Sequence, residues 1–152
     1  MEMIPAMVCS VPPSAHPRRS TPAWASRLLT LDLGLLYNLY ADKLLGLDFV
    51  DQSIYDMQST FYPTVALEYG VPLDSRHTWA KGDWEMFCAA IASTETRDMF
   101  ISKLATWIGQ TNTNRPMTDL YDAAAGTFPV GGPSFMARPV MGGTFALLAL
   151  QS

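Results

Sequence analysis

Apolar residues recur every three or four positions over three segments of the chain, the spacing that brings side chains to one face of an α-helix. Polar residues fill most positions between them, so each segment predicts a helix with one buried face. The expected faces are Ile54, Met57, Phe61 and Val65, then Trp84, Phe87, Cys88 and Ile91, then Phe100, Leu104, Trp107 and Ile108.

Capping and turn residues predict where the first helices begin and end. A helix is expected from Pro22 to Leu45, since proline is favoured at the first helical position. Asp51 is expected to cap a second helix that reaches Tyr69. Pro63 should kink that helix, because a proline ring displaces the carbonyl four residues back.

The second half of the chain predicts two more long helices and an irregular stretch. Asp83 is expected to cap a third helix, and Ser93 or Thr94 a fourth. Residues 117–139 have scattered glycine and proline and no helical period, so short strands or an extended loop are expected there. A short helix is expected over residues 145–150. The fold class is therefore mainly α, with helices joined by short connections into antiparallel hairpins.

Composition excludes some functions. The chain has 152 residues, of which 49% are hydrophobic and 16% charged, and this balance argues against disorder. A net charge of -4 does not suggest a nucleic-acid partner. The apolar run over residues 140–150 is too short to span a membrane, and the first nineteen residues place their basic residues after the apolar part, unlike a secretory signal.

Charged and aromatic residues crowd together only in the stretch YGVPLDSRHTWAKGDWE, residues 69–85. A polar segment carried between two helices is where a binding or catalytic site is expected. The candidates within it are Asp74, Arg76, His77, Lys81, Asp83 and Glu85, interleaved with Trp79 and Trp84.

Each candidate also has a purely structural interpretation, and both stay open. Asp74 would make a turn, Asp83 would cap a helix, and Glu85 would favour the dipole at a helix start. Trp79 and Trp84 would pack in the core. With one histidine in the stretch and no cysteine beside it there is no metal-ligand spacing, and no glycine-rich phosphate loop follows a strand, so neither a metal nor a cofactor is expected.

From Gly34 onward the chain resembles the C-terminal part of the fungal glutaminase A family. The resemblance covers roughly three quarters of the chain in family order. The matching stretches are YNLYADKLLGL (37–47), QSIYDMQSTFYPTVALEYGVPLDSRHT (52–78), KGDWEMFCAAIAS (81–93), TRDMFISKLATWI (96–108), TDLYD (118–122) and ARPVMGGTFALLAL (137–150).

The resemblance implies a toroid of six helical hairpins, an (α/α)6 fold. Twelve helices with their connections need roughly 200 residues. The chain has 152 residues, so residues 34–152 are expected to form only the closing part of that ring, a partial toroid. Residues 1–33 do not resemble the family and are expected to be an irregular segment.

The activity implied by the family is hydrolysis of L-glutamine to glutamate and ammonia. Under that reading Arg76 would bind a carboxylate and His77 would act as acid or base. Asp74, Asp83 and Glu85 would activate water, Lys81 would stabilise negative charge, and Trp79 and Trp84 would line the substrate site. A fragment of the ring is expected to be inactive alone.

Two other interpretations stay open. One is a six-hairpin glycosidase that uses paired carboxylates on a glycan-like substrate. The other is a non-catalytic fragment that associates through the exposed apolar face of the incomplete toroid. The resemblance also implies an extracellular location.

Overall fold

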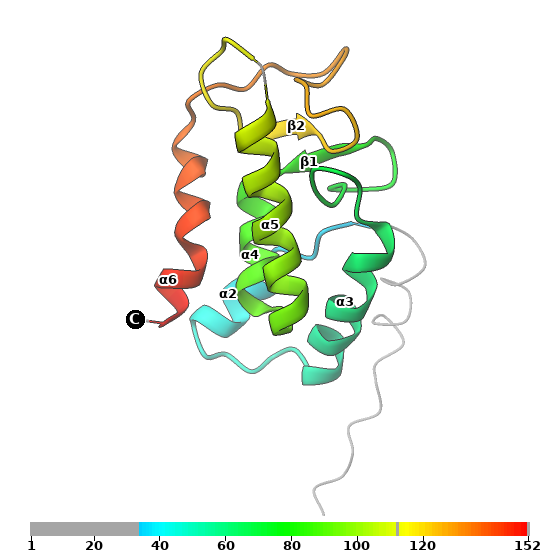
Figure 1. Ribbon diagram of the computed structural model, residues 1–152. Helices are drawn as coiled ribbons and strands as arrows, with labels where there is room; N and C mark the ends of the chain where they lie inside the picture. The colour runs from blue at the N-terminus through cyan, green and yellow to red at the C-terminus, as the bar shows by residue number, and fades with distance from the viewer. Residues whose placement is uncertain (1–33, 112, 152) are drawn as a thin grey trace, which may run out of the picture.

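The computed structural model describes residues 34–111 and 113–151, where helices gather around one central helix and a two-stranded sheet lies near one end (Figure 1). This part of the chain is mainly helical, as the sequence predicted. Its elements, in chain order, are α2 (Leu39–Leu44), α3 (Gln52–Val65), β1 (Trp79–Lys81), α4 (Gly82–Ile91), α5 (Thr94–Gln110), β2 (Leu120–Asp122), the 3-10 helix η1 (Pro139–Phe145) and α6 (Ala146–Gln151).

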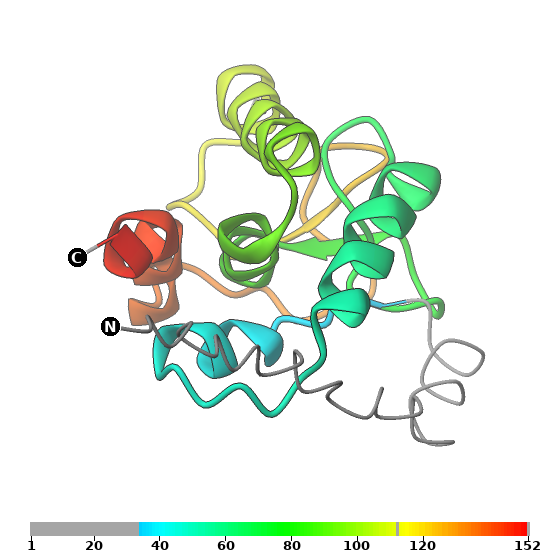
Figure 2. The same ribbon diagram turned by 90° about the horizontal axis from the view of Figure 1, so that it is seen from below.

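Helix α4 is the centre of the described structure. Helices α2, α5 and α6 and the 3-10 helix η1 all pack against it, and the view from below in Figure 2 shows them arranged around it. The sequence predicted a single buried face carrying Cys88, which is fully buried. The helix also buries Met86 and Ala89, because neighbours cover it on several sides.

Helices α4 and α5 form an antiparallel hairpin through a short connection. The Ser93 side chain accepts a hydrogen bond from the Thr96 N–H group at 3.3 Å, which confirms the expected cap of α5. Phe100 and Leu104 point into the core as predicted. Ile108 was expected beside them and is 48% exposed, because no described element covers its flank of α5.

Helix α3 begins where the sequence predicted and ends earlier than the sequence predicted. The Asp51 side chain accepts the Ser53 N–H at 2.9 Å, the expected N-cap. The helix stops at Val65 rather than Tyr69, because Ala66 is extended and the Tyr69 N–H donates to the carbonyl of Ala123.

Pro63 lies inside α3 and leaves the carbonyl four residues earlier, that of Ser59, without a helical donor. The Thr96 hydroxyl donates to this oxygen at 2.7 Å, and the Ser59 hydroxyl accepts the Ser93 N–H at 3.0 Å. The proline therefore helps to join α3 to the start of α5.

The first predicted helix is much shorter in its described part. Residues 22–33 lie outside the described residues, and the chain enters α2 only at Leu39. Gly34 passes so close to the Leu73 carbonyl that an added Cβ would lie 2.5 Å from its oxygen. Leu35 donates its N–H to the same carbonyl, so this segment is held extended. The predicted stop is confirmed, since Gly46 adopts a φ of 59°.

The strands β1 and β2 pair antiparallel, with Ala80 opposite Tyr121. The short strand expected within residues 117–139 is therefore present, and the predicted polar stretch supplies its partner. Because β1 runs directly into α4, Lys81 is the N-cap of that helix and Asp83 is its second residue. The expected cap at Asp83 is wrong: its carboxylate binds the Lys81 ammonium group instead of the helix N–H groups.

Candidate functional site

Four charged side chains from three separate parts of the chain meet beside the junction of β1 and α4. The Lys81 ammonium lies 2.5 Å and 2.6 Å from the two carboxylate oxygens of Asp83 and 3.1 Å from Oδ2 of Asp119. Asp119 also binds Arg138, whose Nε donates to Oδ1 at 3.0 Å and whose second nitrogen binds Oδ2. We call Lys81, Asp83, Asp119 and Arg138 the charged cluster.

Burial differs strongly within the charged cluster. The side chain of Asp119 is fully buried and that of Asp83 is 5% exposed, whereas Arg138 retains 33% exposure. Burial alone would raise the pKa of Asp119, but hydrogen bonds from Arg138 and Lys81 outweigh it and lower the pKa below its ordinary value. Two cations then balance two carboxylates, and Arg138 is the member that solvent reaches most.

Backbone contacts fix the charged cluster in place. The Gly82 N–H donates to the Asp119 carbonyl at 2.8 Å, which ties the start of α4 to the residue before β2. Gly143 of η1 passes so close that an added Cβ would lie 2.7 Å from the Cβ of Asp83. A side chain at that position would push η1 away from the carboxylate.

Aromatic rings border the charged cluster. The Lys81 ammonium lies 5.3 Å from the centre of the Trp84 ring, and Trp84 stacks on Tyr37 at 3.9 Å. The Arg138 guanidinium lies 3.6 Å from the centre of the Phe135 ring. An arginine held between a carboxylate and an aromatic face is oriented well for binding a further carboxylate.

Trp79 lies on the same side of strand β1 as Lys81, and His77 contacts Trp79. Side chains alternate along a strand, so Trp79 and Lys81 share one face of β1 while Ala80 faces the core. The exposed His77 ring stacks on Trp79 with centroids 4.1 Å apart. The structure therefore places His77 beside Trp79, which lies two residues before Lys81 in the chain, and not within the charged cluster.

Asp74 and Arg76 form a separate pair in the preceding turn. The Asp74 carboxylate accepts the Arg76 N–H at 2.9 Å and also binds its guanidinium, and the resulting hydrogen bonds lower the pKa of Asp74. This is the turn geometry that the structural interpretation of Asp74 predicted.

Glu85 is fully buried on the core side of α4. Its Oε1 accepts the Val71 N–H at 2.7 Å, and its Oε2 lies 2.6 Å from the Tyr121 hydroxyl, which also lies 3.0 Å from the Tyr69 carbonyl oxygen. A phenol has one hydrogen, so both contacts of Tyr121 are satisfied only when Glu85 supplies a second proton. Burial raises the pKa of Glu85 to about 8, although the hydrogen bond from Tyr121 acts to lower it.

Sequence reasoning did not find Asp119 and Arg138. Both lie in stretches that carried the family resemblance, TDLYD and ARPVMGG, but nothing in their local pattern marks a site. They join Lys81 only because β2 pairs with β1 and η1 packs on α4. Pairing across more than thirty positions leaves no periodic signal in the sequence.

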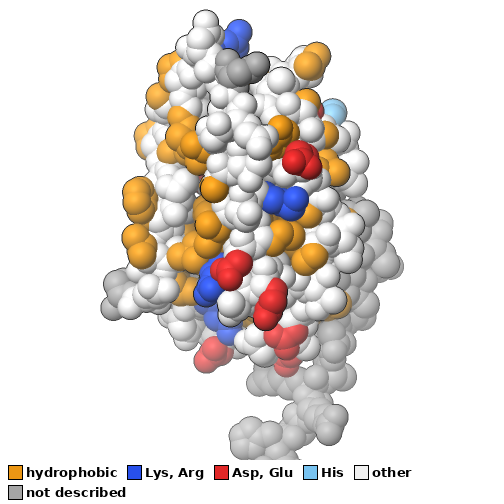
Figure 3. All heavy atoms as spheres, in the orientation of Figure 1, with side chains coloured by type: hydrophobic (Ala, Val, Ile, Leu, Met, Phe, Trp, Pro, Cys, Tyr) orange, Lys and Arg blue, Asp and Glu red, His pale blue; other side chains and the backbone are white. Residues whose placement is uncertain are grey.

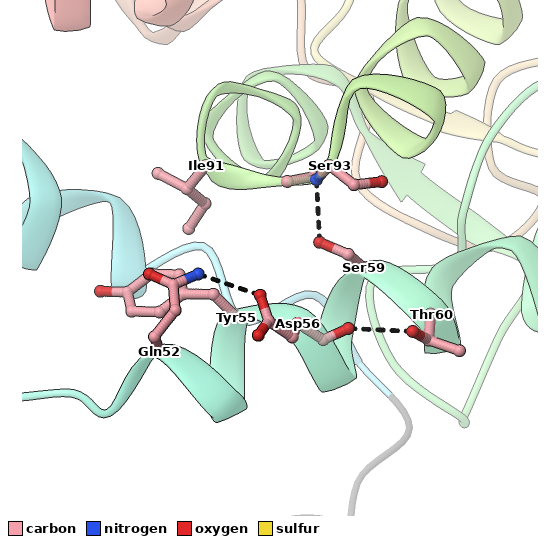
Figure 4. Close-up of a pocket in the computed structure, with 8 residues that line it drawn as sticks. Gln52, Tyr55, Asp56, Ser59, Thr60, Ile91 and Ser93 are labelled. Atoms are coloured by element: carbon pink, nitrogen blue, oxygen red, sulfur yellow. Dashed lines mark hydrogen bonds between the residues drawn. The ribbon is translucent and has the colours of Figure 1, made fainter.

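A cavity of about 430 Å³ lies away from this cluster, between α3 and the α4–α5 connection (Figure 4). Its lining includes Gln52, Tyr55, Asp56 and Ser59 from α3, together with Ser93. The Gln52 amide donates to Asp56, and Ser59 accepts from Ser93, so much of its polar lining is bonded within the protein. None of the predicted site residues lines this cavity.

Two structural features are absent from the described parts of the chain. Among residues 34–111 and 113–151, no helix is long and apolar enough to cross a membrane. The same residues contain no group of three or more histidine, cysteine, aspartate or glutamate side chains that could hold a metal ion.

Comparisons with known proteins identify the family. Residues 32–148 match the family described as the glutaminase A six helical-hairpin domain. The chain is 65% identical over 117 residues to Glutaminase A of Aspergillus oryzae, which covers 77% of this chain and 17% of that protein. It is 45% identical over 104 residues to a protein of Arthroderma benhamiae named "Probable glutaminase", covering 68% of this chain and 12% of that protein.

No solved structure matches the chain. The family match nevertheless spans most of its length, and the two fungal relatives agree with the resemblance seen in the sequence. The chain spans less than a fifth of the length of either relative. It belongs to the glutaminase A six helical-hairpin domain family.

Proposed function

We propose that this chain is part of an amidohydrolase that converts L-glutamine and water to L-glutamate and ammonia, and that the charged cluster lies in its substrate site. The observation that carries the proposal is the 65% identity to the Aspergillus protein named Glutaminase A. The description of the family as a six-hairpin domain supports a toroid, of which the described helices would form one part.

Arg138 is the proposed receiver of the substrate α-carboxylate. It is the most exposed member of the charged cluster, and Asp119 and Phe135 hold its guanidinium in one orientation. Arginine binds carboxylates bidentately, and bonds to charged groups are stronger than neutral ones.

Lys81, Asp83 and His77 are the proposed groups for the amide chemistry. Water would add to the side-chain carbonyl as Asp83 accepts its proton, and the Lys81 ammonium would stabilise the oxyanion. His77 would then donate a proton to the nitrogen as the C–N bond breaks and ammonia leaves. Trp79 and Trp84 would line the site between these groups, since Trp79 stacks on His77 and Trp84 lies under Lys81.

Glu85, Asp74 and Arg76 would support this site from outside it. Glu85 is enclosed in the core, and Asp74 binds Arg76 in the turn before β1. A glycosidase would need two carboxyl groups facing the substrate. Asp119 is fully buried and binds both Lys81 and Arg138, so it is not available as a second carboxyl group.

The test uses a chimera in which residues 32–148 of this chain replace the matching segment of the Aspergillus relative. Ammonia release from glutamine is measured for the chimera, for the same protein with Asp83→Asn, and for the 152-residue chain alone. We expect the chimera to be active, the variant to lose at least a hundredfold in kcat, and the isolated chain to be inactive. Turnover of aryl glycosides without ammonia release would contradict the proposal, and full activity of the variant would contradict the site.

A further inference from the structure

The last thirteen described residues, Pro139 to Gln151, contain no charged side chain. They form η1 and α6, one of which follows directly on the other. Helices on a protein surface normally place charged or polar residues on their outer face. In this stretch only Thr144 and Gln151 are polar, although α6 lies at the outside of the described structure (Figure 1).

The segment formed by η1 and α6 exposes two large apolar side chains. Ala146 is 3% exposed, whereas Phe145 is 62% and Leu148 is 63% exposed. The Tyr40 hydroxyl donates to the Ala146 carbonyl at 2.9 Å, which fixes the side of the helix that faces inward. Phe145 and Leu148 therefore project outward, while Leu147 and Leu150 are partly buried and pack against the core.

Helix α5 also exposes apolar side chains, on the flank that faces away from the end of α3. The Lys103 ammonium donates to the Leu67 carbonyl at 2.6 Å, which places this flank of α5 beside the end of α3. Ile101 and Ile108 lie seven positions apart on the opposite flank of the buried Leu104, and they are 42% and 48% exposed. Figures 1 and 2 show α6 on that side of the central helix α4.

These exposed apolar side chains lie on α5 and on the segment formed by η1 and α6. We call Ile101, Ile108, Phe145 and Leu148 the α5–α6 face. Figure 3 shows apolar side chains gathered along and between these two helices, with charged side chains at the lower end of the apolar band. An exposed apolar surface with this extent marks an interaction site in a soluble protein.

We propose that the α5–α6 face is the docking surface for an apolar helix from another hairpin of the same six-hairpin domain. A six-hairpin domain needs twelve helices, and the described residues supply α2 to α6 and η1. The matched segment is only 17% of the Aspergillus protein, so most of that protein remains to supply the partner helix. The four residues of the face carry no charge and fit the apolar stripe of a neighbouring helix, with the Arg97–Asp98 ion pair at the border of the face.

This inference rests on membership of the family and is independent of the reaction under the proposed function. Its readout is therefore folding stability and mass, and not ammonia release. If the protein has no glutaminase activity, this face is still expected to be buried. If the protein is active but the face is exposed to solvent, only the proposed docking surface is refuted.

The experiment compares the same substitutions in two settings. Ile108→Glu and Phe145→Glu are placed in the 152-residue chain and in the chimera, with Val130→Glu as the matched control because Val130 is 90% exposed and lies outside the face. Thermal unfolding gives Tm, and light scattering coupled to size-exclusion chromatography gives mass. If the unsubstituted chimera does not fold, the substitutions are made in the Aspergillus protein at the aligned positions.

We expect the two face substitutions to leave the Tm of the 152-residue chain within about 2 °C of the unsubstituted value, because they add charge to exposed positions. In the chimera they should lower Tm by at least about 5 °C, while Val130→Glu changes neither protein. If Ile108→Glu and Phe145→Glu give the chimera the same Tm as Val130→Glu does, the proposal is overturned. A dimer of the isolated chain that Phe145→Glu dissociates, with the chimera unaffected, would assign the face to a second copy and also overturn it.

Discussion

The buried acid Glu85 should make the stability of this protein fall as pH rises, and Glu85→Gln tests that expectation. In the folded protein a neutral carboxyl group satisfies Val71 on one side and Tyr121 on the other. An ionised carboxylate would leave the Tyr121 hydroxyl with one hydrogen for two acceptors. Glutamine has the same shape, and its amide N–H can donate to Tyr121 at every pH.

The size of the effect follows from the pKa. Burial raises the pKa of Glu85 to about 8, against the lowering effect of its hydrogen bonds with Tyr121 and Val71. In the unfolded chain a glutamate has a pKa near ~4.3. Between these values the folded protein holds one more proton than the unfolded chain, so stability is full at low pH and falls by about 1.4 kcal/mol per pH unit. The total loss by pH 8 is on the order of 5 kcal/mol.

The assay is urea unfolding of the 152-residue chain at pH 5, 6, 7 and 8. We expect the free energy of unfolding of Glu85→Gln to depend less on pH, so that its advantage over the unsubstituted chain grows from pH 5 to pH 8. Glu95→Gln is the control, because Glu95 is exposed at the start of α5. Parallel pH profiles for the unsubstituted chain and Glu85→Gln would refute the reasoning, since they would show that Glu85 does not change protonation on folding.

Three further substitutions test individual contacts. Tyr121→Phe removes the hydroxyl that contacts Glu85 and should lower the free energy of unfolding by about 1–3 kcal/mol in urea at pH 6; no change would show that this contact contributes nothing. Thr96→Val leaves the Ser59 carbonyl without its donor and should cost about 1–3 kcal/mol, whereas Thr96→Ser should recover most of it. Asp51→Ala removes the cap of α3 and should cost about 1 kcal/mol, measured as a lower urea midpoint with an unchanged slope.

The helices were predictable where local chemistry determines them. Asp51 and Ser93 cap their helices through their own side chains, and Gly46 ends α2 in the left-handed region, so each signal acts within a few residues. The predicted cap at Asp83 is wrong because the Asp83 carboxylate has a stronger partner in Lys81, two positions away. The predicted end of α3 is wrong because the Tyr69 N–H donates to the carbonyl of Ala123, a residue more than fifty positions later.

For the same reason, the sequence identified only some of the residues of the charged cluster. Lys81, Asp83 and Trp84 stand close together in the chain, and the structure keeps them together. Asp119 and Arg138 reach them through strand pairing and through the packing of η1 on α4. Neither contact leaves a local pattern, so no periodicity or spacing could have identified these two partners.

The most direct test of the proposed site is the steady-state kinetics of the chimera with Arg138→Gln. Arg115→Gln serves as the control, because Arg115 is exposed and binds Ser134 outside the charged cluster. If Arg138 holds the α-carboxylate of glutamine, its loss should raise KM and lower kcat/KM at least tenfold, with little change in kcat and with Arg115→Gln unaffected. An unchanged kcat/KM for glutamine in a folded Arg138→Gln chimera would show that substrate does not bind at this cluster.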